Sequence, residues 1–163
     1  MAWLAGLLLP TIETSQAIQR LIGEAGQVPP GALGVLFVPE LMGRRSPRTD
    51  PNAAGAFFGL RMQHGRPELA RAVLEGVAHA LRDGLDALRT HGFRPNSLGL
   101  VGGAGDAAVW PGILAGILDI RIDRLPDTVG AALGAAVLAA EGAGIASAVS
   151  VAGSSAGERV ETS

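Results

Sequence analysis

The sequence contains no cysteine, and all 13 of its basic residues are arginine. The absence of cysteine excludes disulfide bonds and thiolate metal sites, and it is compatible with a reducing compartment, so we expect a cytoplasmic protein. The absence of lysine excludes a Walker-type phosphate lysine and a Schiff-base nucleophile. Both exclusions narrow the chemistry that the chain can supply by itself.

Charge of either sign is also sparse, since charged residues make up 17% of the sequence and the net charge is -2. Nucleic-acid binding needs clustered positive charge. The one local group of basic residues, Arg44, Arg45 and Arg48, lies among glycine and prolines, and we interpret it as a solvated turn. We therefore expect no nucleic-acid partner.

Long hydrophobic segments are lacking as well. The first nine residues are apolar, but they have no positive n-region and no small-residue cleavage site, so we interpret them as a buried strand. The Ala/Gly-rich run over residues 129–140 is interrupted by Glu141 and is shorter than the roughly 20 residues of a spanning helix. We expect a core helix there and no membrane partner.

The length of 163 residues and the 48% hydrophobic share describe one globular domain. Helical and strand-like patterns alternate along it, which predicts α/β units with right-handed crossovers. The predicted helices cover 11–23, 67–90, 107–119 and 129–142, and the predicted strands cover 33–39, 55–60, 97–101 and 120–125. The small, polar and aperiodic tail, 146–163, is expected to be mostly disordered.

The predicted helix over 67–90 is apolar over most of its girth, with its polar residues in one stripe, so other elements must cover several of its sides. His79 belongs to that stripe, and we interpret it as a surface residue rather than a ligand. The two later helices carry glycines four residues apart, which we expect to pack closely on a sheet. The pairs are Gly112 with Gly116 and Gly130 with Gly134.

A glycine-rich loop, Gly102, Gly103, Ala104 and Gly105, separates a predicted strand from a predicted helix. Such a loop lets a ligand approach the backbone and directs the amides of the helix start toward negative charge. The same glycines would also serve a tight turn, and the residues alone leave both interpretations open. The loop lacks the Rossmann spacing and the Gly-Lys-Ser/Thr ending of a P-loop.

Residues 55–75, GAFFGLRMQHGRPELARAVLE, resemble the second signature of the FGGY carbohydrate kinases. Three further segments resemble the same family. They are LGVLFVPELMGRRSPRTDPNAAGAF over 33–57, VGGAGDAAVWPGILA over 101–115 and VGAALGAAVLAA over 129–140. Near the start, AIQRLIG over 17–23 looks like the helix in which related glycerol kinases place a nucleotide-contacting Gln.

The resemblance implies an α/β fold: an actin-like ATPase (ribonuclease H-like) lobe with a mixed sheet flanked by helices. It implies that residues 1–145 are the C-terminal, nucleotide-side domain. Trp110 stands at the family's Trp position beyond the glycine loop. The nucleotide-binding residues implied are Gly102, Gly103, Ala104, Gly105, Asp106, Ala107 and Gln19.

The function implied is transfer of the ATP γ-phosphate to a carbohydrate hydroxyl by a xylulokinase-like enzyme. ATP and Mg²⁺ would be the cofactors. The metal, the sugar and the catalytic aspartate would be held mainly by an N-terminal lobe, joined in cis or in trans. The isolated chain is therefore expected to be inactive. We expect Asp50, Asp106 and Asp119 to be structural, since a loop, a helix start and a helix end explain them.

A second hypothesis is a non-catalytic nucleotide-binding or interaction module derived from such a kinase. It is motivated by departures from the family pattern at Ala107, Arg44 and Gly116. Under both hypotheses, the absence of the partner lobe should leave an apolar patch, formed partly by the Gly102 loop and Trp110, that drives formation of a homodimer or poor solubility. The sequence identifies neither the sugar nor the oligomeric state.

Overall fold

The computed structural model describes residues 1–101, 109–125, 131–144 and 158–160. Helices and strands alternate from α3 onward, as the sequence patterns predict, whereas before α3 two helices and a 3-10 turn are followed by two strands. The helices are α1 (Ala2–Leu8), α2 (Thr14–Ala25), α3 (Arg66–Thr90), α4 (Val109–Leu118) and α5 (Ala131–Gly142), with a 3-10 turn η1 (Ala32–Gly34). The strands are β1 (Leu36–Val38), β2 (Ala56–Phe58), β3 (Ser97–Leu100), β4 (Arg121–Arg124) and β5 (Glu158–Val160).

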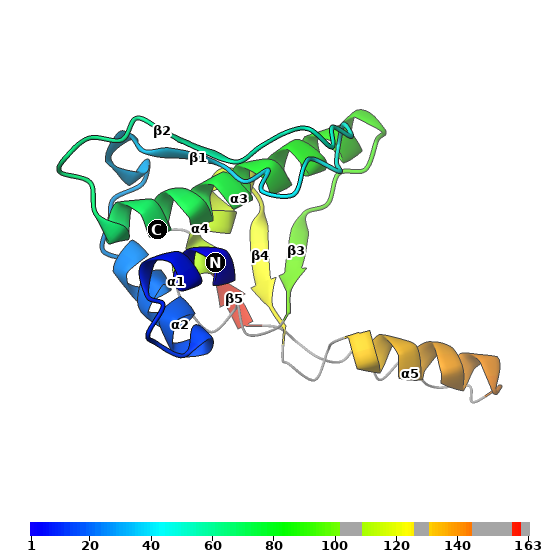
Figure 1. Cartoon of the computed structure of the whole chain (residues 1–163). Helices are drawn as coiled ribbons and strands as arrows, with labels where there is room; N and C mark the ends of the chain where they lie inside the picture. Colours follow the sequence, from blue (N-terminus) through cyan, green and yellow to red (C-terminus); the bar gives the residue numbers. More distant parts are fainter. Residues whose placement is uncertain (102–108, 126–130, 145–157, 161–163) are drawn as a thin grey trace.

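The strands form two small sheets. β1 and β2 are antiparallel, with Phe37 opposite Phe57. β3 and β4 are parallel and are connected through α4, which is the predicted α/β crossover unit. β5 pairs antiparallel with β4, so the order of this sheet is β3-β4-β5 (Figure 1). β5 falls within the tail expected to be mostly disordered, and the rest of that tail lies outside the described residues.

The N-terminal segment is a helix, so the strand predicted for it is wrong. Leu4 and Ala5 are buried in the core, and Trp3 stacks on Phe37 of β1 with ring centroids 6.2 Å apart. A continuous apolar run shows no period, and it therefore does not distinguish a buried strand from a buried helix. Packing against α2 and β1 decides for the helix.

α3 is the central element, because α2, α4, β1 and η1 all pack on it (Figure 1). The backbone N–H of Gly65 donates to Glu68 Oε2 at 2.7 Å, and Pro67 occupies the first turn, so the sequence defines a sharp helix start. The predicted covering on several sides is confirmed. His79 is exposed, also as predicted.

One ion pair of the polar stripe on α3 is structural rather than solvated. Arg71 is only 8% exposed, and its Nε donates to Glu75 Oε1 at 2.6 Å. The Glu75 carboxylate also accepts the backbone N–H of Gly31 at 3.0 Å. A buried cation is tolerated when a carboxylate partners it, and here the pair also fastens the turn before η1 to the middle of α3.

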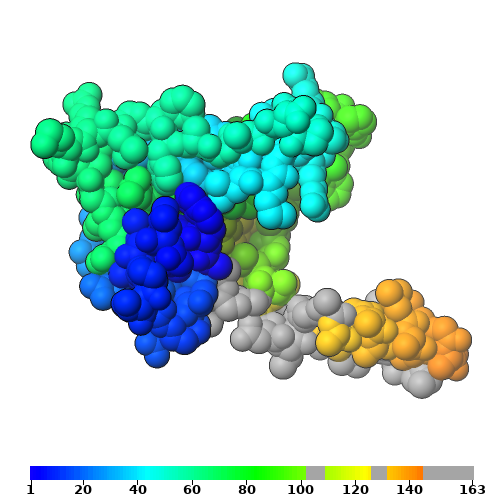
Figure 2. All heavy atoms as spheres, in the orientation of Figure 1, coloured from blue at the N-terminus to red at the C-terminus, as the bar shows by residue number. Residues whose placement is uncertain are grey.

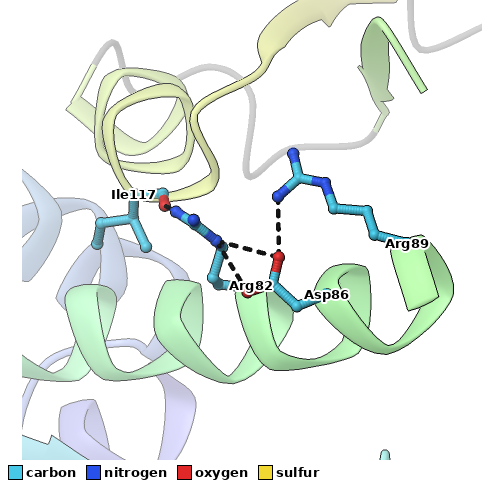
Figure 3. A network of polar contacts seen from close by, with 4 residues as sticks. All are labelled: Arg82, Asp86, Arg89 and Ile117. Carbon is cyan, nitrogen blue, oxygen red and sulfur yellow. Dashed lines mark hydrogen bonds and ion pairs between the residues drawn. The ribbon is translucent and has the colours of Figure 1, made fainter. Parts of the chain in front are cut away.

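A second polar network joins α3 to α4 (Figure 3). Arg82 Nη1 donates to the backbone oxygen of Ile117 at 2.6 Å, and Arg82 Nε donates to Asp86 Oδ2 at 3.1 Å. Arg89 Nη1 donates to Asp86 Oδ1 at 2.9 Å, and this hydrogen bond is the main reason why the pKa of Asp86 lies below its ordinary value. The network satisfies a carbonyl in the last turn of α4 and fixes that helix on α3.

The predicted core helix at 129–142 is not a core element in this structure. α5 extends away from the rest of the chain, its described side chains are exposed or half-exposed, and Leu138 is 70% exposed (Figures 1 and 2). Apolar composition indicates that a helix is suited to burial, but it does not supply the neighbour that buries it.

The expectation of closely packed helix glycines is wrong for the glycines that the structure describes. A Cβ at Gly112, Gly116 or Gly134 would meet no atom within 4 Å. Gly130 lies outside the described residues. In the described part of the chain, no helix is both long and apolar enough to cross a membrane.

The close approach of α3 to β1 is testable at Gly76. A Cβ there would overlap the backbone oxygen of Phe37, so Gly76→Ala is expected to destabilise the fold by about 1–3 kcal/mol. Gly84→Ala is the matched control on the same helix, because a Cβ there meets nothing within 4 Å. We expect Gly84→Ala to be neutral or to stabilise by up to about 1 kcal/mol. Urea unfolding of both variants checks this, and equal midpoints would contradict the proposed contact.

Candidate functional site

The helix α2 carries Gln19, the first of the residues that the family resemblance selects. Glu13 caps the helix, since its carboxylate accepts the backbone N–H groups of Ser15 at 2.9 Å and Gln16 at 3.1 Å. Leu21 and Ala17 bury one face of α2 in the core, whereas Gln19 is exposed. The side-chain amide of Gln19 is thereby available to a ligand.

Trp110 is the second residue of α4, the helix that follows β3 in the chain. It is half-buried and packs against the core. Proline at position 111 is fully buried beside it. The indole is therefore held at a fixed place between the core and the surface.

Gln19 and Trp110 line the same pocket, which has a volume of about 410 Å³. The other lining residues come from the N-terminus, α2 and the middle of α3, and most are aliphatic. They are Met1, Ser15, Ile18, Ile22, Val73, Leu74 and Val77. Apolar walls with a few polar groups are the usual lining of small-molecule sites, and the volume lies within their range.

The lining indicates which part of a ligand this pocket suits. An aromatic ring, aliphatic side chains and one amide favour a flat heteroaromatic group, which can stack, bury its faces and exchange hydrogen bonds with the amide. The described residues that line the pocket include no arginine or lysine side chain, which is the usual side-chain partner of a phosphate. Burial lowers the pKa of the Met1 amino group at the edge of the pocket.

Charged residues at the far end of α2 hold that helix on α3. Arg66 Nη2 and Nε donate to the Glu24 carboxylate at 2.5 and 2.6 Å, and Arg20 Nε donates to it at 3.0 Å. The Arg66 hydrogen bond is the main reason why the pKa of Glu24 lies below its ordinary value. Because Gln19 is on α2 and Val73 is on α3, this Glu24–Arg66 clamp helps to fix the two walls of the pocket.

The remaining residues of the predicted nucleotide site, 102–107, lie outside the described residues. Their flanks are described: β3 ends at Leu100 and α4 begins at Val109, so the glycine segment does connect a strand to a helix. The role of these residues, and that of Gln19, stays a prediction. What the structure adds is that Gln19 lines the same pocket as Trp110, which stands in α4 shortly after that segment.

The other residues singled out in the sequence lie in structural positions. Asp50 belongs to a turn in which its Oδ1 accepts the backbone N–H of Asn52 at 3.0 Å. Asp119 follows the last turn of α4. Arg44 pairs with Glu40 at 3.0 Å and does not line the pocket. Among the described residues, no group of three or more acidic or histidine side chains is arranged to hold a metal ion.

The sequence pattern did not indicate that Val73, Leu74 and Val77 of α3 form a wall of the pocket. Val73 and Leu74 belong to the family signature, and Val77 follows it. The apolar pattern of α3 predicted only that other elements cover several of its sides. The pattern of one helix does not tell which neighbour each side meets, so the pocket emerged only from the packing of α2 and α4 on α3.

Comparison with known proteins identifies the context of this pocket. Residues 1–143 match the family model described as FGGY family of carbohydrate kinases, C-terminal domain. The xylulose kinase of Escherichia coli (strain K12) is 47% identical over 117 residues, which are 71% of this chain and 24% of that protein. The chain thus spans about a quarter of the length of this curated relative.

Solved structures agree in architecture. The crystal structure of xylulose kinase from Rhodospirillum rubrum superposes with a TM-score of 0.83 at 35% identity, covering 99% of this chain and 32% of that one. The structure of Plasmodium falciparum glycerol kinase with ADP superposes with a TM-score of 0.74 at 25% identity, covering 88% of this chain and 29% of that one. These neighbours confirm the actin-like ATPase fold that the sequence resemblance implies.

The Glu24–Arg66 clamp predicts a specific acid sensitivity. Because the folded-state pKa of Glu24 is lowered, its contribution to the free energy of unfolding is present above the ordinary carboxyl value of 4.5 and is lost as the pH falls through the folded value. Glu24→Gln is therefore expected to be less stable than the unaltered chain at pH 7, with the difference shrinking below about pH 4.5.

The measurement is urea unfolding between pH 3 and pH 7. Glu141→Gln is the matched control, since Glu141 is an exposed residue near the end of α5, away from the clamp. A stability difference for Glu24→Gln that stays constant over this pH range would contradict the clamp.

Proposed function

The chain belongs to the FGGY family of carbohydrate kinases and matches its C-terminal domain, and from this premise we propose that it is the ATP-binding lobe of a sugar or polyol kinase. The reaction proposed is transfer of the ATP γ-phosphate to a carbohydrate hydroxyl, with a xylulose-type sugar as the first candidate substrate. Catalysis requires an N-terminal lobe in the same or another polypeptide. A cytoplasmic location accords with the use of ATP and with the absence of cysteine.

The observation that carries this proposal is the shared pocket of Gln19 and Trp110. It would receive the adenine ring, for which its apolar walls and single amide are suited. To the glycine segment, which precedes α4 in the sequence, we assign contact with the remaining part of the nucleotide. That order follows the chain, since the glycine segment stands between β3 and the helix α4 that carries Trp110.

The phosphates of ATP need basic side chains or backbone amides, and the metal ion needs acidic side chains, arranged together in one place. ATP would supply the transferred phosphoryl group, and a divalent ion, which we propose to be Mg²⁺, would neutralise its charge. The described residues hold no acidic cluster for such an ion and no lysine for the phosphates. We therefore assign the metal ligands, the sugar and the base to the N-terminal lobe, and to this chain the binding and orientation of the nucleoside.

Nucleotide binding by the isolated chain is the direct test. Thermal unfolding with Mg-ATP is expected to shift upward, since ligand at about 100 times its dissociation constant stabilises by roughly 2.7 kcal/mol. Gln19→Ala is expected to weaken binding about two- to tenfold, the equivalent of one hydrogen bond of about 0.5–1.5 kcal/mol. Gln16→Ala is the control, because Gln16 is exposed on the same helix and does not line the pocket.

Two results would count against the proposal. Equal affinity of Gln19→Ala and Gln16→Ala for Mg-ATP would remove the assigned pocket. No shift at millimolar nucleotide would favour the alternative of a non-catalytic interaction module, which departures such as Arg44 and Gly116 also motivate.

Activity measurements test the requirement for a second lobe. The isolated chain is expected to show no ATP-dependent phosphorylation of xylulose, ribulose or glycerol, because it lacks a clustered metal site among its described residues and phosphoryl transfer depends on metal and base. Substantial turnover by the isolated chain would overturn this part of the proposal.

A further inference from the structure

The β1–β2 hairpin has an apolar face that is open to solvent. Phe37 and Phe57 point toward α3, where Phe37 Cδ1 lies 3.2 Å from the position that a Cβ at Gly76 would take. Successive residues of a strand alternate between its faces, so Leu36 and Phe58, which are opposite each other in the ladder, point away from α3. Their side chains are 62% and 57% exposed. We call this surface the outer hairpin face, and it consists of Leu36, Val38, Ala56 and Phe58.

An open face of this composition is unusual for an antiparallel hairpin. When one face lies on the core and the other lies in water, apolar and polar residues alternate along each strand. The strands here read LFV and AFF, which is apolar at every position and typical of strands that are covered on both faces. Figure 1 shows α3 along one side of the hairpin, and Figure 2 shows the hairpin segment at the upper surface of the molecule. The outer hairpin face is therefore suited to an apolar partner.

A closed turn presents two arginines at one end of this hairpin. Arg44 and Asp50 exchange two backbone hydrogen bonds, at 2.8 and 2.9 Å, and the hydroxyl of Thr49 donates to the backbone oxygen of Arg45 at 3.3 Å. Arg45 and Arg48 are exposed within the turn, and in the described part of the chain neither guanidinium has an ion-pair partner. Because the backbone of the turn is fixed, both cations are presented at a defined place.

The charge around the outer hairpin face has one sign. Arg61 follows β2 at the other end of the hairpin, is exposed, and has no ion-pair partner among the described residues. The carboxylates nearby are already engaged, since Glu40 is bound by Arg44 at 3.0 Å and Asp50 accepts a backbone N–H at 3.0 Å. The charges left available at both ends are thus positive, although the net charge of the chain is -2. A complementary partner carries carboxylates on either side of an apolar centre.

Charge also distinguishes between the possible occupants of this face. In a symmetric dimer the same patch meets itself, so the arginines of two copies would come together, and such contacts between like charges are unfavourable. A bilayer of anionic lipid would satisfy the arginines. The regular spacing of cross-strand pairs on a flat strand face, however, is matched by the regularly spaced side chains of another polypeptide. The observations favour a segment of a different protein.

We propose that the outer hairpin face, with Arg45 and Arg48 at one end and Arg61 at the other, docks a segment of another protein that has an apolar centre and acidic ends. This inference goes beyond the proposed function. The hairpin residues do not line the pocket of Gln19 and Trp110, so docking at this face requires no nucleotide.

The test is a selection of peptides from a random-sequence library on the immobilised full chain, followed by fluorescence anisotropy with the selected peptides. We expect these peptides to carry apolar residues in the centre and Asp or Glu at the ends. Leu36→Glu is expected to weaken their binding at least about tenfold, because it places a charge at the centre of the face. Arg45→Glu combined with Arg48→Glu is expected to weaken it by a similar factor and to reduce its dependence on salt.

Matched controls separate the docking face from a general effect of charge. Leu138→Glu places the same new charge on α5, where Leu138 is 70% exposed, and Gln16→Glu adds a carboxylate to the exposed side of α2. Both are expected to bind the selected peptides like the unaltered chain. Circular dichroism verifies that each variant folds. Leu36→Glu is expected to leave the Mg-ATP shift unchanged, so a failure of the proposed nucleotide site is recognised separately.

Four outcomes would overturn the inference. The first is a library that yields no peptide, and the second is a set of peptides that are not acidic or that bind Leu36→Glu as tightly as the unaltered chain. The third is a dimer of the unaltered chain that Leu36→Glu dissociates, which would make a second copy the occupant. The fourth is binding to phosphatidylglycerol vesicles, but not to peptides, that is lost in the Arg45→Glu and Arg48→Glu double variant, which would make a lipid surface the occupant.

Discussion

The structure depends on the close approach of α3 to β1 at Gly76, where the helix backbone meets the Phe37 carbonyl without an intervening side chain. This contact brings the β1–β2 hairpin onto α3, and Phe37 then packs against Trp3 and Phe57. The helix α1 is thereby connected to the same centre. With α2 and α4 on its other sides, α3 becomes the rigid axis on which every candidate site is built.

Polar contacts position the helices along that axis. Glu24 and Arg66 hold α2 near the start of α3, and Arg82 holds the last turn of α4 farther along it. Each contact is weak as a source of net stability, because charges at the surface are screened and well hydrated. Their contribution is orientation: hydrophobic burial does not specify the angle at which a helix lies, whereas hydrogen bonds between given atoms do. The Gln19–Trp110 pocket results from the hydrophobic packing of α2 and α4 on α3 together with the hydrogen bonds that orient these helices.

The sequence predicted those elements whose signals are local. The proline and glycines around α3 predicted the type and place of that helix to within a few residues, and the short segments 97–101 and 120–125 were predicted as the strands that became β3 and β4. The apolar N-terminal segment has no proline or glycine that marks a helix start, and its helical structure became evident only from packing, including that of Trp3 on Phe37. The same limit applies to α5 and to Gly112 and Gly116, where composition indicated burial but no described neighbour provides it. Gln19 was found through resemblance, and Val73 beside it required three-dimensional packing.

The strand β3 and the pocket of Gln19 and Trp110 are linked by the order of the chain. β3 leads through the glycine segment to Trp110, and α4 returns to β4 beside β3. Arg82 of α3 holds the last turn of α4, so the position of Trp110 at the start of α4 depends on the same helix that supplies Val73 to the wall of the pocket. Because α2 and α4 both pack on α3, a change in the angle of either helix would alter the shape of that pocket.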